Sequence, residues 1–290
     1  MGAQPSSRKD SNRRRPKRDR RRKKLVDERA INAFVESAAR TNVFLPTFFG
    51  ADSPLLMWKF FIGLAMMPLC WATIETFFAS FDHVARSAAF WKTAEFWYFT
   101  IGFVGWGVAF AGLMKYRIRW MIWLYVAGHE LTHAFFVMVC RGNVADVHIS
   151  ADGGHILTNR NNFLISLSPY FVPFYTVLVI AGWGLADWLT DVPFTQTAVH
   201  AFFAIIGVTW AFHLTFTVWM IAREQPDVDQ NGRIFSVVLI LWINTLIISA
   251  LLIAASPVTW SEFLAAWSVN FSSLADRFVE SVAEIIGWFS

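Results

Sequence analysis

The sequence has few charged residues and almost no cysteine, and each shortage excludes a class of protein. Charged residues make up 16% of the 290-residue chain, whereas hydrophobic residues make up 56%. A water-soluble surface needs a larger charged share, so this composition favours a membrane protein. The two cysteines, Cys70 and Cys140, both lie in apolar runs. Their number and placement exclude a disulfide framework and give thiol catalysis little support.

Positive charge is concentrated in one short segment near the start of the chain. Residues 8–24, RKDSNRRRPKRDRRRKK, hold 12 of the 25 basic residues. The run has no aromatic residues and no folded nucleic-acid reader beside it, so we expect no nucleic-acid partner. Residues 1–24 are instead expected to form a disordered cytoplasmic arm that fixes topology and touches anionic lipid. The first forty residues are too charged for a cleavable signal peptide, so the first span is expected to direct insertion.

Six apolar runs approach the roughly 20 residues that a helix needs to cross about 30 Å of hydrocarbon. They lie near residues 58–80, 96–113, 120–140, 163–183, 199–221 and 234–255. The sequence therefore predicts an all-α polytopic membrane protein with about six transmembrane helices in the lipid bilayer. Pro169 and Pro173 make the fourth run the weakest of these spans, because proline interrupts a helix.

The positive-inside rule places the N-terminus in the cytoplasm, and six crossings would return the C-terminus to the same side. This scheme leaves several basic residues outside. One re-entrant segment would reverse the side of the membrane on which every later loop lies. The basic residues outside would be Arg86, Lys92, Arg141, Arg160, Arg223 and Arg233.

Three further segments flank or interrupt the apolar runs. Residues 25–54 carry an amphipathic pattern expected at the membrane interface, ahead of a membrane domain over residues 55–256. Residues 257–290 also space their apolar side chains by three or four, which predicts a C-terminal amphipathic helix. Between the third and fourth runs, residues 144–157 alternate in polarity and turn at an Asp-Gly-Gly sequence. This pattern predicts a short β-hairpin.

The third apolar run contains AGHELTHAFF, in which His129, Glu130 and His133 form an HExxH pattern. Four residues turn a helix by about 400°, so both imidazoles project from nearly one face and can bind one Zn²⁺ ion. Glu130 stands beside them, in the position of a general base. Ionisable groups on a membrane helix cost several kcal/mol unless they are compensated, and a metal ion would compensate them.

A catalytic zinc ion needs a third protein ligand and an open position for water. The metzincin position for a third histidine holds Val139, and the first glutamate after Glu130 is Glu224. The strongest candidates therefore lie in REQPDVDQNGR, residues 223–233, which contains Glu224, Asp227 and Asp229.

The chain resembles the site-2 protease family of intramembrane zinc metalloproteases over roughly residues 120–245. The resemblance includes AGHELTHAFF, the DGGH turn at 152–155, NFLISLSPYFVP at 162–173, and HLTFT followed by QPDVDQNGRIFS. It implies that Asp227 is the third ligand, with Asp229 as a rival within one turn. Because His129 lies in the middle of a predicted span and Asp227 follows another, we expect the 223–233 loop to dip inward or the fifth span to begin earlier.

The resemblance and the metal pattern together predict an intramembrane zinc metalloprotease. Glu130 would act as general base, His129, His133 and Asp227 would hold Zn²⁺, and a membrane-anchored or membrane-adjacent protein or peptide would be hydrolysed. The alternatives are a non-catalytic relative that binds membrane segments, a proton or cation transporter, and a structural scaffold. Other polar residues in the spans are candidates for a substrate path or for contacts with the ligands. They are Glu75, His200, His213, Thr215, Thr217 and Asn244.

Overall fold

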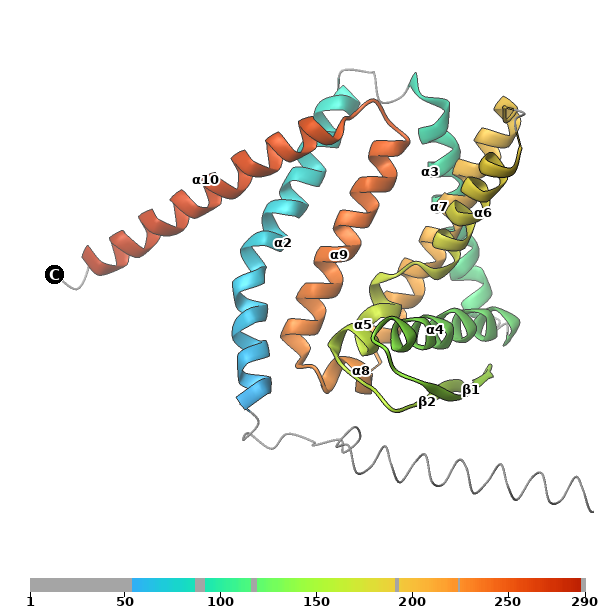
Figure 1. The fold of residues 1–290 in the computed structure, drawn as a ribbon. Helices are drawn as coiled ribbons and strands as arrows, with labels where there is room; N and C mark the ends of the chain where they lie inside the picture. Colours follow the sequence, from blue (N-terminus) through green and yellow to red (C-terminus); the bar gives the residue numbers. More distant parts are fainter. Residues whose placement is uncertain (1–53, 87–91, 116–118, 191–192, 224, 288–290) are drawn as a thin grey trace, which may run out of the picture.

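The structure is a computed structural model, and it describes residues 54–86, 92–115, 119–190, 193–223 and 225–287. Within these ranges the protein is all-α with one two-stranded sheet, which confirms the predicted fold class (Figure 1). The basic arm and all but the last residue of the predicted interfacial segment over residues 25–54 lie outside the described residues.

Five helices are long and apolar enough to cross a membrane: α2 (Pro54–Arg86), α3 (Ala94–Lys115), α4 (Arg119–Val139), α7 (Gln196–Ile221) and α9 (Arg233–Ala254). The fourth predicted run is divided into α5 (Phe163–Phe171) and α6 (Phe174–Leu189), which meet at 76°. Val172, between them, has an extended backbone and precedes Pro173. Because proline disfavours helical geometry in the preceding residue, α5 ends there. The chain has five candidate spans, or six if the bent pair is one span.

The helices are arranged around a crosswise α4. In Figure 1, α2, α3, α6, α7 and α9 run between two ends of the molecule, and α4 lies across the lower end. The single-turn helix α8 (Pro226–Asp229) and α5 lie at that end too. α4 is thus long and apolar enough to cross a membrane, as the sequence predicts, but it lies across the direction of the other helices.

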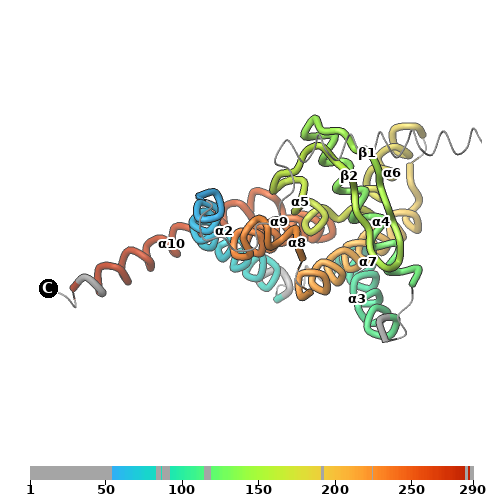
Figure 2. The backbone as a smooth tube through the Cα atoms, turned by 90° about the horizontal axis from the view of Figure 1, so that it is seen from below, coloured from blue at the N-terminus to red at the C-terminus, as the bar shows by residue number. Residues whose placement is uncertain are grey.

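The hairpin lies against α4. Strand β1 (Val144–Ser150) pairs antiparallel with β2 (Gly153–Thr158), as the sequence predicts. After α4 the chain turns sharply at Arg141, which has a left-handed φ of 58°, and the Gly142 N–H donates to the Val137 carbonyl. Ile149 then packs into an apolar cluster with residues of α4 and α7. Figure 2 shows the hairpin covering α4 at the lower end.

Two apolar clusters fix the elements around the site. In the first, Tyr125 of α4 stacks on Phe216 of α7 with ring centroids 4.5 Å apart. In the second, Tyr170 of α5 packs with Val228 of α8 and Phe235 of α9. Buried aromatic side chains contribute large apolar areas, so these contacts hold α4, α5 and α8 in fixed positions. The last helix, α10 (Trp260–Gly287), packs across α2 away from this region.

Candidate metal centre

The HExxH residues lie on a buried part of α4. His129, Glu130 and His133 are each less than a tenth exposed. The two imidazole Nε2 atoms are 3.2 Å apart, and their rings come from successive turns of the helix. This geometry matches the predicted arrangement of both rings on one helix face.

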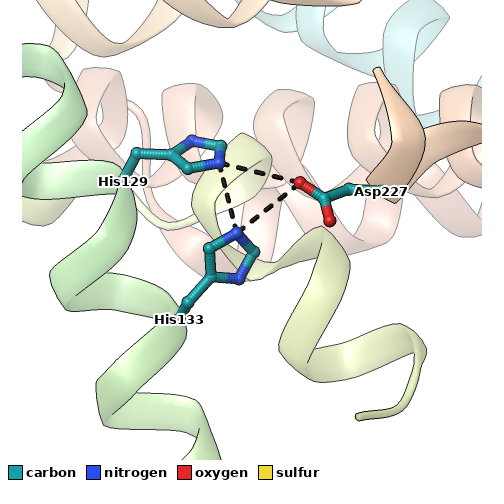
Figure 3. A group of neighbouring side chains, drawn as sticks. All are labelled: His129, His133 and Asp227. Atoms are coloured by element: carbon teal, nitrogen blue, oxygen red, sulfur yellow. Dashed lines mark hydrogen bonds and ion pairs between the residues drawn. The ribbon is translucent and has the colours of Figure 1, made fainter. Parts of the chain in front are cut away.

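A carboxylate from a distant part of the chain completes the group (Figure 3). Asp227 Oδ2 lies 3.8 Å from His129 Nε2 and 3.6 Å from His133 Nε2. The three ligand atoms all lie within 4.8 Å of one another, so these residues could hold a metal ion. Asp229 is exposed and does not belong to this group, and Glu224 lies outside the described residues.

The second nitrogen of each histidine also has a partner. His133 Nδ1 lies 2.8 Å from the Ile165 carbonyl oxygen, and His129 Nδ1 lies 3.1 Å from the Tyr125 hydroxyl. A carbonyl oxygen only accepts, so His133 Nδ1 donates to it, and Nε2 is the ring nitrogen that faces Asp227. Metal-bound histidines are commonly oriented by such contacts. The Asn162 side chain accepts from the Ile165 N–H and caps α5, which places the carbonyl.

Asn231 positions the helix that carries Asp227. Its Nδ2 atom donates to the Asp227 carbonyl oxygen at 2.9 Å and to Ser166 Oγ at 2.7 Å. Its Oδ1 atom accepts from Lys59 Nζ of α2 at 2.7 Å. The sequence reasoning missed Asn231 and Lys59. Lys59 is 172 residues away from Asn231, and no spacing pattern marks a contact of that kind.

His129 and His133 keep the Asp227 carboxyl group ionised. Burial alone would raise the pKa of its carboxyl group, but the polar contacts with the His129 and His133 side chains hold that pKa below its usual range. The Tyr170 hydroxyl, at 3.3 Å, donates to Oδ2 as well. The carboxylate is therefore kept ionised, which is the form that binds a cation.

The hairpin covers the general-base candidate. Gly154 of β2 lies so close to Glu130 that a Cβ atom there would be 2.6 Å from Glu130 Cγ and 2.7 Å from Oε1. Arg119, at the start of α4, forms an ion pair of 2.9 Å with Asp152 in the hairpin turn. The Asp-Gly-Gly turn seen in the sequence thus brings a residue without a side chain against Glu130.

Other polar residues that the sequence singled out have different partners. His213 Nε2 lies 3.3 Å from Asn244 Oδ1, and Asn244 Nδ2 donates to the Tyr170 carbonyl at 2.9 Å. His213 also lines a cavity of about 20 Å³ beside His129, large enough for one water molecule. His200 stacks on Tyr98, away from the centre.

No family model matches the chain, and neither a curated protein nor a solved structure matches it. The resemblance to site-2 proteases therefore stays a prediction from the motifs, and the function must be argued from the site.

Proposed function

We propose that this protein is an intramembrane zinc metalloprotease that hydrolyses peptide bonds of membrane-anchored or membrane-adjacent substrates. The observation that carries the proposal is the convergence of His129, His133 and Asp227 within 4.8 Å. The two histidines lie on α4, which is long and apolar enough to cross a membrane, and Asp227 lies on the short helix α8. Two imidazoles and one carboxylate are a donor set that suits Zn²⁺ and leaves a position open for catalysis. The partner contacts of both histidines support the same reading.

A bound Zn²⁺ ion would supply Lewis acidity at this position. Glu130 is the chain's own proton acceptor: it is buried, it follows His129 directly, and it would take the proton of the attacking water through its carboxylate. Its later role would be to return that proton to the leaving amine. Gly154 and the hairpin limit the space around this carboxylate and would keep it in one orientation.

The test compares the purified protein with its Glu130→Gln variant. Each is analysed for bound zinc, and each is incubated with a model transmembrane peptide whose products are read by mass spectrometry. General-base catalysis contributes about 10²–10⁴-fold, so we expect Glu130→Gln to keep zinc and to lose at least about a hundredfold in cleavage rate.

Glu95→Gln is the matched control, because Glu95 lies in the first turn of α3 and lies outside the candidate centre. It is expected to keep both zinc and activity. Equal cleavage by the wild type and Glu130→Gln would remove Glu130 from the mechanism. Absence of zinc from the wild type would favour the transporter or the scaffold.

A further inference from the structure

The lower end of the molecule in Figure 1, where α2 and α9 begin and α3 and α7 end, is called here the site end. It holds α4, the hairpin, α5 and α8, whereas α2, α6 and α9 end, and α3, α7 and α10 begin, at the opposite end. Along the described chain, α2, α3, α6, α7 and α9 connect the two ends. α4 starts and finishes at the site end.

Basic residues are concentrated at the site end. Among the described residues, those in or next to the elements at this end are Lys59, Lys115, Arg119, Arg141, Arg160, Arg223 and Arg233. Among the described residues at or next to the helix ends of the opposite end, only Arg86 and Lys92 are basic. In addition, the basic run over residues 8–24 precedes α2, which begins at the site end.

The two ends of α4 fit a helix that lies along a membrane surface. Arg119 begins the helix and Arg141 follows it, and both are exposed. A crossing helix would place these two arginines on opposite sides of the bilayer. Between them, α4 exposes Trp120, Trp123 and Phe135. Tryptophan is enriched at membrane interfaces, and an apolar face with flanking arginines is typical of an interfacial helix.

The outer face of the hairpin is polar as well. Asp146, His148 and His155 are exposed on it. Hydrocarbon disfavours such groups by several kcal/mol, so this face requires water or lipid headgroups. A surface position for α4 gives the hairpin that environment.

We infer that the chain crosses the bilayer five times, through α2, α3, the α5–α6 pair, α7 and α9, and that α4 lies along the cytoplasmic surface. The positive-inside rule counts Lys and Arg in short loops. Six crossings would leave Arg141, Arg160, Arg223 and Arg233 outside, whereas five crossings place all four inside with the basic arm. The start of α10 is then outside.

This topology determines on which side of the membrane the candidate metal centre opens and how deep it lies in the bilayer. His129, His133 and Asp227 open at the cytoplasmic surface of the bilayer, and not at its midplane. If the proposed proteolysis holds, the substrates are membrane proteins whose scissile bond lies at the cytoplasmic end of a transmembrane segment. Water is available there, and a helix end unwinds into an extended form more readily than a helix centre does.

Cysteine labelling in intact cells tests the number of crossings without any need for activity. In a Cys140→Ser background, single cysteines replace Asp146 in the hairpin, Asp187 near the end of α6, Ser261 at the start of α10, or Lys92. All four positions are exposed, and the remaining Cys70 is buried. A membrane-impermeant maleimide is applied before and after permeabilisation, and an N-terminal tag reports the side of the arm.

Five crossings predict that Asp146→Cys is protected in intact cells and labelled after permeabilisation. Asp187→Cys and Ser261→Cys should be labelled in both conditions. Six crossings predict the reverse for all three. Lys92→Cys is outside in both schemes and serves as the control. Labelling of Asp146→Cys in intact cells, or protection of the Asp187 and Ser261 variants, would overturn the inference.

The position of the cut tests the substrate class separately. A peptide with distinguishable ends is inserted in one orientation, and its products are mapped by mass spectrometry. Cleavage at the cytoplasmic end is expected. A cut at the other end would overturn the substrate class but leave the labelling result standing, and a lack of any cleavage would count against the proposed protease alone.

Discussion

Two polar clusters lie among the apolar helices, and they satisfy their polar atoms differently. The first is the candidate metal centre. The second, here called the polar seam, joins α2, α9 and α10 through Thr73, Thr76, Trp242, Trp267 and Asn270. Thr73 Oγ1 accepts from the indole N–H of both Trp242 and Trp267 at 3.0 Å, and Asn270 Nδ2 donates to Thr76 Oγ1 at 2.9 Å.

In the polar seam each of these donors meets an acceptor, which is how polar side chains ordinarily join membrane helices. In the centre, the Nε2 atoms of His129 and His133 and a carboxylate oxygen of Asp227 converge within 4.8 Å of one another, and each could serve as a metal ligand. Ionisable groups buried together cost free energy, and a bound cation would offset that cost. This contrast indicates that the polar seam serves helix packing, whereas the candidate metal centre is suited to binding a ligand.

The largest expected effect is the loss of metal when Asp227 is replaced. Asp227→Ala removes the carboxylate and leaves two protein ligands, one fewer than a catalytic zinc site needs. We expect the variant to lose its zinc on dialysis, as measured by elemental analysis. Asp229→Ala is the matched control, since Asp229 is exposed on the same short helix. Metal loss from the control alone would exchange the roles of the two aspartates.

A smaller effect is expected when the space around Glu130 changes. Gly154→Ala would place a Cβ atom within 2.7 Å of both Glu130 and Val126, so the hairpin or the carboxylate must shift. A displacement on the order of 1 Å at a catalytic group can cost about a hundredfold. We expect cleavage to fall by up to that factor while zinc is retained. Gly182→Ala is the control, because nothing lies within 4 Å of its added Cβ.

The next effect concerns the hydrogen bonds of Asn231 that hold Asp227 in position. Asn231→Ala removes the donors that hold the Asp227 carbonyl and Ser166, and it leaves Lys59 without its acceptor. Replacing residues that orient metal ligands commonly weakens metal binding by about 10–100-fold. A competition titration with a chelator measures this change. Asn161→Ala, at a more exposed position beside α5, should leave the affinity unchanged; equal weakening in both variants would contradict a specific role for Asn231.

The sequence predicts the parts of the fold and site that depend on local spacing. The HExxH spacing puts His129 and His133 on one face of α4, and the Asp-Gly-Gly turn predicts the hairpin. Pro173 explains why the fourth run is divided. Each of these features depends on residues that are close together in the chain.

Long-range packing decides the rest, and sequence spacing does not encode it. Hydropathy alone treats the α4 segment as one of six spans, so the sequence predicts that the 223–233 loop dips inward, or that the fifth span begins earlier, for Asp227 to reach His129. In the structure α4 lies across the end where α8 lies, and His129 and Asp227 meet there. The roles of Asn231 and Lys59 likewise appear only when α2, α5 and α8 are packed together.

The smallest expected effect tests whether the polar seam and the candidate metal centre are independent of each other. Thr73→Val keeps the shape of the side chain but removes the acceptor of two indole N–H groups in the polar seam. Hydrogen bonds between membrane helices contribute little each, so we expect a loss of about 1 kcal/mol in unfolding free energy. Zinc content and cleavage should be unchanged, because the polar seam shares no residue with the centre. A fall in zinc affinity for Thr73→Val would show that the two clusters are coupled through α2 and Lys59.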